Sequence, residues 1–156
     1  MTPHTASLLI RPALPDETDA LTEIALEAKA YWGYDDDFME SCRKELTITL
    51  AKMGRYRIRV AQVGGEIAGF SAMNAEGGAA DVEDLFVAPR FMGQGIAHRL
   101  MEDMLTHARR HGIRLVHVEA DPNAASFYER EGFSLCGEAP SGSIPGRKLP
   151  VLELSF

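Results

Sequence analysis

"RFMGQGIA", residues 90–97, places two glycines one residue apart, between an apolar run that ends at Val87 and the strongest helical pattern of the chain. The first turn of a helix carries backbone N–H groups with no partner inside the helix, and together with the helix dipole they attract anions. Glycine lets the backbone approach a phosphate closely and adopt positive φ. The stretch therefore predicts a phosphate-binding turn, with a glycine-rich connection that holds no ligand as the alternative.

Two common phosphate motifs do not match this turn. A P-loop requires Lys and Ser or Thr after its last glycine, whereas Ile96 and Ala97 follow here. A dinucleotide fingerprint requires a third glycine where His98 stands. Because Glu119 or Asp121 can still imitate the ribose-binding acid of that fingerprint, a nucleotide-binding domain of another type remains a weaker alternative.

The hydrophobic pattern on either side of the turn predicts alternating strands and helices. Strands are expected over residues 8–11, 56–63, 67–74, 81–87, 113–120, 133–137 and 149–154, and helices over 16–30, 38–51, 93–111 and 123–131. This order predicts an α/β (α+β) fold, with a mixed, mostly antiparallel sheet of about six to seven strands flanked by about four helices. The unit from Asp81 to Ala120 is expected to be a right-handed parallel crossover.

Length and composition indicate a single globular domain over residues 1–156, with 46% hydrophobic residues and a formal net charge of -7. The acidic balance argues against a nucleic-acid partner. Cys42 and Cys136 stand alone in the sequence, so neither a metal site nor a disulfide framework is expected. No apolar run is long enough to span a membrane, and no basic segment precedes the first apolar run as in a signal peptide. We therefore expect a cytoplasmic protein.

The glycine turn resembles the pyrophosphate-binding motif of the GCN5-related N-acetyltransferase (GNAT) family, Gln/Arg-x-x-Gly-x-Gly/Ala, with Arg90, Gly93 and Gly95 at the matching positions. A second segment, "DPNAASFYEREGF" at residues 121–133, is similar to the helix of that family in which an Asn and a Tyr face the acetyl-CoA thioester; here they are Asn123 and Tyr128. The expected element order also matches the family fold, so the resemblance covers nearly the whole chain.

The resemblance implies an acetyl-CoA-dependent N-acetyltransferase that acts by direct transfer to a primary amine of a small molecule or peptide, and it allows a homodimer. A non-catalytic acyl-CoA-binding or sensing protein of the same fold is the alternative. Many family members carry Arg where this chain has Met92. Because backbone N–H groups provide most of the pyrophosphate contacts, we expect this departure to weaken binding without abolishing it.

The resemblance also implies a set of cofactor-binding residues along the strand, the turn and the following helix. The pantetheine arm is expected to bond the backbone of one strand, where it splays from Leu115–Ala120, and the N–H of Val87 to polarise the thioester carbonyl. Asn123 is expected to bond the pantetheine amide or the backbone nearby. The full set is Leu85, Phe86, Val87, Arg90, Gly93, Gln94, Gly95, Ile96, Ala97, His98, Asn123 and Tyr128.

Tyr128 is the candidate general acid, because a tyrosine hydroxyl with a pKa near ~10 is protonated at neutral pH and can donate to a thiolate. A packing role in the core is the alternative. Glu83 is the first candidate for the general base. Since Glu83 and Asp84 are adjacent on one strand, their side chains are expected to point to opposite faces. His117, Glu119 and a water relay remain alternatives for the base.

Aromatic residues in one loop and a cation in another are candidates for the acceptor site. Tyr31, Trp32 and Tyr34 lie between the first two helices, where aromatic rings can enclose an amine, although Trp32 can equally cover the core. Arg147 lies in the Pro/Gly/Ser-rich loop before the last strand. It can bind an acceptor carboxylate or be an ordinary surface charge.

Overall fold

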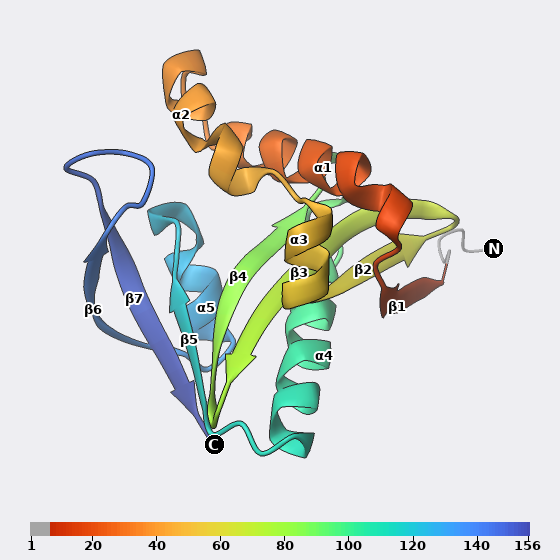
Figure 1. Ribbon diagram of the computed structural model, residues 1–156, viewed down its shortest axis with the longest axis vertical. Helices are drawn as coiled ribbons and strands as arrows, with labels where there is room; N and C mark the ends of the chain where they lie inside the picture. The colour runs from red at the N-terminus through yellow and green to blue at the C-terminus, as the bar shows by residue number, and fades with distance from the viewer. Residues whose placement is uncertain (1–6) are drawn as a thin grey trace.

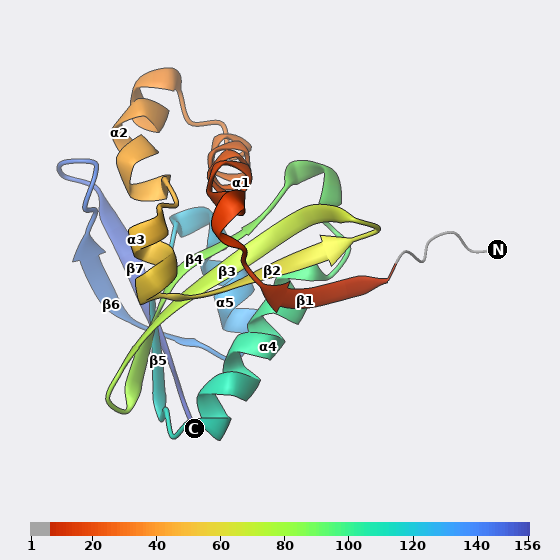
Figure 2. The same cartoon turned by 45° about the vertical axis from the view of Figure 1, so that its right-hand side comes forward.

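A computed structural model describes residues 7–156, and Figures 1 and 2 show the fold from two directions. Residues 1–6 belong to the N-terminal segment in which we expect no signal peptide, and they lie outside the described residues.

Seven strands and five α-helices make up the described part of the chain. The strands are β1 (Leu8–Pro12), β2 (Arg57–Val63), β3 (Glu66–Glu76), β4 (Ala79–Val87), β5 (Leu115–Glu119), β6 (Ser134–Pro140) and β7 (Lys148–Ser155). The α-helices are α1 (Thr18–Ala30), α2 (Asp36–Leu46), α3 (Leu50–Arg55), α4 (Ile96–Arg110) and α5 (Ala125–Arg130). Short 3-10 turns precede α1 and α5 and follow β4, at Pro15–Glu17, Pro122–Ala124 and Pro89–Phe91.

All seven strands form one sheet in the order β1-β2-β3-β4-β5-β7-β6. Every neighbouring pair is antiparallel except β4 and β5, which α4 connects as a parallel crossover. The mixed, mostly antiparallel α/β architecture predicted from the sequence is confirmed.

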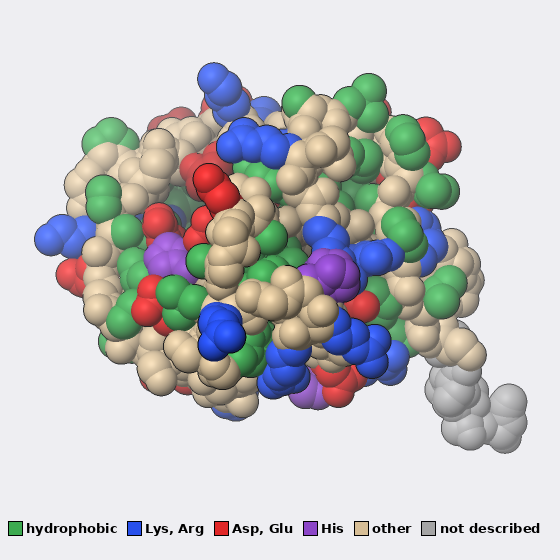
Figure 3. Space-filling view, turned by 60° about the horizontal axis from the view of Figure 1, so that its bottom comes forward, with side chains coloured by type: hydrophobic (Ala, Val, Ile, Leu, Met, Phe, Trp, Pro, Cys, Tyr) green, Lys and Arg blue, Asp and Glu red, His purple; other side chains and the backbone are tan. Residues whose placement is uncertain are grey.

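The helices cover both faces of the sheet (Figures 1 and 2). On one face, Leu21 and Ile24 of α1 pack with Phe70 of β3 in a buried cluster. On the other face, Met101 and Met104 of α4 pack into a second cluster that extends to β5, β7 and α5. The helix α4 keeps its charged side chains outside and ends in a basic turn, which suits the negative end of a helix dipole. Figure 3 looks at the lower end of the molecule and shows basic and acidic side chains interspersed there.

The predicted helix over residues 38–51 is wrong in its extent, because the structure has two helices in this region. The break falls at Thr47–Thr49, where β-branched residues favour extended backbone: ψ is 124° at Thr47 and 165° at Thr49. Thr49 then caps α3, and its hydroxyl accepts a hydrogen bond from the N–H of Lys52 at 3.2 Å.

Candidate active site

The parallel strands β4 and β5 separate partway along their length and open a cleft. They pair only at three positions, Ala79 with Leu115, Ala80 with Val116, and Asp81 with His117. Beyond Asp81 the edge of β4 that faces β5 has no strand partner among the described residues, so its N–H and C=O groups are open to a ligand. The cleft has a volume of about 930 Å³, and Leu85, Phe86 and Val87 all line it.

The glycine turn stands at one end of this cleft, where Met92 and Ala97 line the wall. Gly93 and Gly95 have φ of 80° and 77°, values that a residue with a side chain rarely adopts. A Cβ added at either glycine would have no atom within 4 Å, so their conformation and not crowding requires glycine, and the space beside them is open.

The backbone of the turn offers a row of free donors. None of the N–H groups from Gly93 to His98 donates to another described residue, and the first one that does is that of Arg99, to the oxygen of Gly95 at 3.1 Å. No side chain caps the start of α4. This geometry fits an anionic group such as a pyrophosphate. The side chains predicted beside it, those of Arg90 and Gln94, are both exposed, and Arg90 pairs with Glu66 at 3.4 Å.

The His98 side chain, two residues into α4, forms an ion pair with Glu131, with 2.9 Å between Nδ1 and the carboxylate. The hydrogen bond that the imidazole donates to Glu131 raises the pKa of His98. The pair joins the start of α4 to the end of α5, so the imidazole adds positive charge beside the glycine turn when it is protonated.

Tyr128 lines the cleft and is buried, with 6% of its surface exposed. Its ring packs edge-on against Phe127 and Phe133, with centroids 5.3 and 5.4 Å away. The hydroxyl makes no hydrogen bond to a described residue, and its pKa is raised, first by burial and then by the negative charge of Asp84. Tyr128 therefore packs in the core, and because it also lines the cleft with a protonated hydroxyl, the role of general acid stays a prediction.

The expectation that Glu83 and Asp84 point to opposite faces is wrong. Ala72 of β3 pairs with Asp84 and the next residue, Met73, pairs with Val82, so Glu83 is the extra residue of a β-bulge. A bulge places two consecutive residues opposite one and breaks the alternation of side chains. As a result both carboxylates line the same cleft.

Asp84 is the functional candidate that the sequence did not single out. Its side chain is 8% exposed and accepts no hydrogen bond from the described residues. Burial raises its pKa to about 7, against a partial lowering by Lys52 and a further increase from Glu83 and Glu45. Glu83 is more exposed, and its pKa is raised by burial and by Asp81. Of the other acids and bases considered, Glu119 lines the cleft, whereas His117 pairs with Asp81 at 2.9 Å.

The aromatic residues predicted for the acceptor site divide into three positions. Trp32 lines the cleft with 44% of its surface exposed, whereas Tyr31 lies outside the cleft and is 60% exposed. The ring of Tyr34 stacks on Phe38 of α2 at 3.9 Å between centroids. Its hydroxyl turns toward Asp121, just beyond β5.

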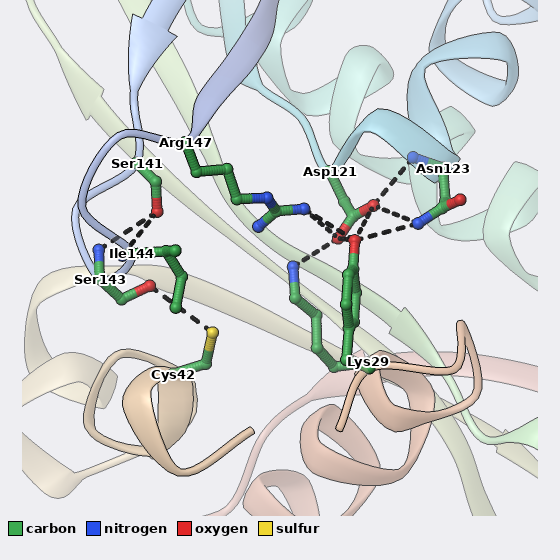
Figure 4. Close-up of polar contacts among 9 residues, drawn as sticks. Lys29, Cys42, Asp121, Asn123, Ser141, Ser143, Ile144 and Arg147 are labelled. Atoms are coloured by element: carbon green, nitrogen blue, oxygen red, sulfur yellow. Dashed lines mark hydrogen bonds and ion pairs between the residues drawn. The ribbon is translucent and has the colours of Figure 1, made fainter. Parts of the chain in front are cut away.

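Asp121 is the centre of a polar network that joins four segments (Figure 4). Its carboxylate accepts hydrogen bonds from Lys29 Nζ at 2.5 Å, from Tyr34 Oη at 2.9 Å and from the backbone and side chain of Asn123 at 2.8 and 2.9 Å. Burial raises the pKa of Asp121, but the bonds from Lys29, Asn123 and Tyr34 outweigh it and lower that pKa to about 2. Asp121 is therefore ionised at any working pH.

Arg147 and Asn123 both belong to this network. Arg147 Nη2 donates to Tyr34 Oη at 2.7 Å and lies 3.4 Å from Asp121. The side-chain amide of Asn123 donates to Tyr34 Oη as well as to Asp121. Arg147 is thus neither free nor an ordinary surface charge. No sequence signal pointed to Lys29, because the network joins residues up to 113 positions apart.

Metal clusters and membrane-spanning helices are both absent from the described part of the chain. Within residues 7–156, no group of three or more His, Cys, Asp or Glu side chains is placed to hold a metal ion. In the same residues, no helix has both the length and the apolar character needed to cross a membrane.

Comparison with known proteins identifies relatives of the whole fold. The family model described as "Acetyltransferase (GNAT) domain" matches residues 22–141. A 5-NmdU N-acetyltransferase of Pseudomonas phage PaMx11 is 27% identical over 137 residues, which cover 86% of this chain and 93% of the phage protein.

Solved structures share the architecture at low identity. The PaiA N-acetyltransferase of Thermoplasma acidophilum, solved with coenzyme A, superposes with a TM-score of 0.81 at 19% identity over 96% of this chain and 99% of the other. A GCN5-related N-acetyltransferase of Rhodopseudomonas palustris superposes with a TM-score of 0.80 at 21% identity, over 100% and 99% of the two chains.

Proposed function

This chain belongs to the GNAT acetyltransferase family, and on that premise we propose that it moves an acetyl group from acetyl-CoA directly to a primary amine of a small molecule or peptide. The observation that carries the proposal is the row of open N–H groups from Gly93 to His98, at the end of a cleft that also holds Asp84 and Tyr128. A turn of this kind alone would suit many phosphate ligands. A buried carboxylate and a buried phenol in the same cleft supply the proton transfers that acetylation of an amine requires.

The chain's backbone would hold the donor at two places. The N–H groups of the turn bind the pyrophosphate, with Arg90 and His98 adding positive charge at the rim. The open edge of Leu85–Val87 bonds the pantetheine arm as an added strand, and the N–H of Val87 polarises the carbonyl. Bound acetyl-CoA supplies an activated thioester. Asn123, at the opposite edge, steadies the arm through the backbone near Asp121.

Two side chains would move the protons. Asp84 removes a proton from the acceptor ammonium, so that the neutral nitrogen can attack the acetyl carbon and form the carbon–nitrogen bond. Tyr128 Oη donates a proton to the sulfur as the carbon–sulfur bond breaks, and the second proton that the nitrogen loses on becoming an amide returns to the Tyr128 oxygen. We place Asp84 ahead of Glu83 as the base because it is more buried and lacks a hydrogen-bond partner among the described residues. Its pKa of about 7 also suits a base that works near neutral pH.

The acceptor would enter beside Trp32 and Arg147, which both line the same cleft. In this arrangement Tyr34 acts indirectly, by holding Arg147 in place, and Tyr31, which lies outside the cleft, does not contact the acceptor. The phage relative is named for N-acetylation of 5-NmdU, which makes 5-NmdU the first acceptor to test.

Thermal unfolding with saturating acetyl-CoA, and with NAD as control, tests the donor. A ligand at about 100 times its Kd stabilises by about 2.7 kcal/mol, which should raise Tm by about 5–10 °C for a domain of this size. A shift with NAD and none with acetyl-CoA would support a nucleotide-binding domain of another type and contradict the proposal.

Turnover separates an enzyme from an acyl-CoA sensor. A steady release of free thiol in the presence of an amine, lost in Tyr128→Phe with little change in the Kd of acetyl-CoA, is the expected result. Binding of acetyl-CoA without thiol release for any amine would favour the sensor.

A further inference from the structure

We propose that the acceptor amine carries a second, anionic group, a carboxylate or a phosphate, which Arg147 and Lys29 bind while the amine lies beside Asp84. This inference rests on the proposed acetyl transfer and adds a class of acceptor to it. It follows from where the charged side chains that line the cleft lie, with two cations around Asp121 and carboxylates at the β-bulge of β4.

The cationic wall has more positive charge than its own carboxylate neutralises. Lys29 and Arg147 together carry two positive charges against the single negative charge of Asp121, and all three residues line the cleft. Lys29 Nζ lies 2.5 Å from Asp121, whereas the closest approach of Arg147 to that carboxylate is 3.4 Å. Asp121 also accepts hydrogen bonds from Tyr34 and Asn123, so its acceptor capacity is taken. Glu119 also lines the cleft but makes no ion pair with Lys29 or Arg147, so one positive charge of the network is left over.

Arg147 is the residue that offers this charge to a ligand. Only its Nη2 bonds to the protein in residues 7–156, so the donors on Nε and Nη1 remain available. The guanidinium lies 5.2 Å from the centre of the Tyr34 ring and 4.8 Å from that of Phe38, which fixes its plane. Its side chain keeps 17% exposure, as expected for a group that faces the cleft (Figure 4). A fixed guanidinium with free donors recognises carboxylate or phosphate oxygens.

The part of the cleft beside the β-bulge has the opposite character. Glu83 and Asp84 are neighbours there, and Glu45 of α2 adds a third carboxylate to the lining. Lys44 and Lys52 also line the cleft, and Lys52 lowers the pKa of Asp84, but burial outweighs that effect. The carboxylates outnumber these two cations. The Asp84 side chain is more than nine-tenths buried and has no hydrogen-bond partner in the described residues. An ammonium group would supply that partner. The β-bulge and the Asp121 network therefore select for opposite charges on one acceptor.

This arrangement also disfavours other amines. A diamine would place its second ammonium against Lys29 and Arg147, and a neutral amine would leave the free donors of Arg147 without a partner. We therefore expect the order of preference to be anion-bearing amines first, neutral amines next and diamines last.

Matched acceptors test this order. Amino carboxylates and aminoalkyl phosphates of several chain lengths are compared with the alkylamine and the diamine of the same length. At least one anion-bearing series should have a kcat/KM about 10-fold or more above its neutral partner, through a lower KM. The two series separate a carboxylate site from a phosphate site.

Substitution of the cation tests its role. Arg147→Gln should reduce the preference for the anionic partner about 10-fold, Arg147→Lys should retain part of it, and the Kd of acetyl-CoA should stay unchanged in both. Lys148→Gln is the matched control, because Lys148 is the next residue, is exposed and does not line the cleft.

Titration of the wild-type protein saturated with CoA provides a reading that requires neither turnover nor a variant. Binding of an anion-bearing amine, and weaker binding of its neutral and diamine partners, supports the inference. Equal or better turnover or binding of the neutral or diamine partners would overturn it, as would the absence of binding of every anion-bearing amine at tens of millimolar. Failure of acetyl-CoA itself to bind would overturn the proposed function instead.

Discussion

Asparagine in place of Asp84 should make the protein more stable and far less active, because the burial that prepares this carboxylate for catalysis also opposes its ionisation. The pKa of Asp84 rises from 3.8 to about 7 on folding. A difference of about three pKa units corresponds to about 4 kcal/mol. The folded state binds the proton on Asp84 more tightly than the unfolded state does. The resulting contribution to the free energy of unfolding is therefore fully present below about pH 4 and is lost as the pH rises through 7.

The asparagine side chain cannot ionise, so the variant avoids this loss. At pH 8 we expect Asp84→Asn to be more stable than the wild type by up to about 4 kcal/mol. About 3 kcal/mol of that difference should develop between pH 5 and pH 8, which widens the gap in Tm on the order of 5–10 °C. Thermal unfolding of both proteins across this range measures it.

The same substitution removes the proposed base. The wild-type kcat/KM should fall about tenfold for each pH unit below an apparent pKa of about 7, which forms the acidic limb of its pH profile. Asp84→Asn should lose this acidic limb, and its rate should fall by about 10²–10⁴. Glu83→Gln is the control from the same bulge and should keep the limb. A rate of Asp84→Asn within tenfold of the wild type, together with a Tm advantage that does not depend on pH, would refute this reasoning. If only Glu83→Gln lost the acidic limb, Glu83 would be the base.

Three further substitutions test the rest of the site. Because φ is 77° at Gly95, Gly95→Ala should weaken acetyl-CoA binding about 10-fold and lower the free energy of unfolding by about 1 kcal/mol. The control Gly54→Ala, inside α3, should stabilise the protein slightly. Calorimetry measures the binding, and thermal unfolding measures the stability. Tyr128→Phe should lower kcat by about 10²-fold and leave Tm nearly unchanged, since the hydroxyl bonds to no described residue; a large fall in Tm with normal kcat would assign Tyr128 to packing alone. Asp121→Ala should cost about 2 kcal/mol in denaturant unfolding at pH 7 by leaving Lys29 and its neighbouring cation uncompensated, and a neutral result would show that the network adds no stability.

The sequence predicted those features that neighbouring residues specify. The alternation of apolar residues located the strands, and the apolar face of α4 located the principal helix to within a few residues. Gly93 and Gly95 predicted positive φ at the start of that helix, and the structure confirms it. These are properties of a few consecutive residues, so they are readable before any long-range contact forms. The break between α2 and α3 was missed because Thr47–Thr49 give only a weak helix-ending signal.

The tertiary structure decided which side chains meet in the cleft. Glu83 and Asp84 share one face because β3 and β4 pair with a shifted register, and that shift depends on two strands and not on either sequence alone. The pKa of Asp84 depends on how deeply packing from several elements buries it. The Asp121 network gathers Lys29, Tyr34 and Arg147 from α1, the next loop and the loop before β7. Local sequence patterns set backbone geometry, whereas the charge and chemistry of the site arise from contacts between segments that are distant along the chain.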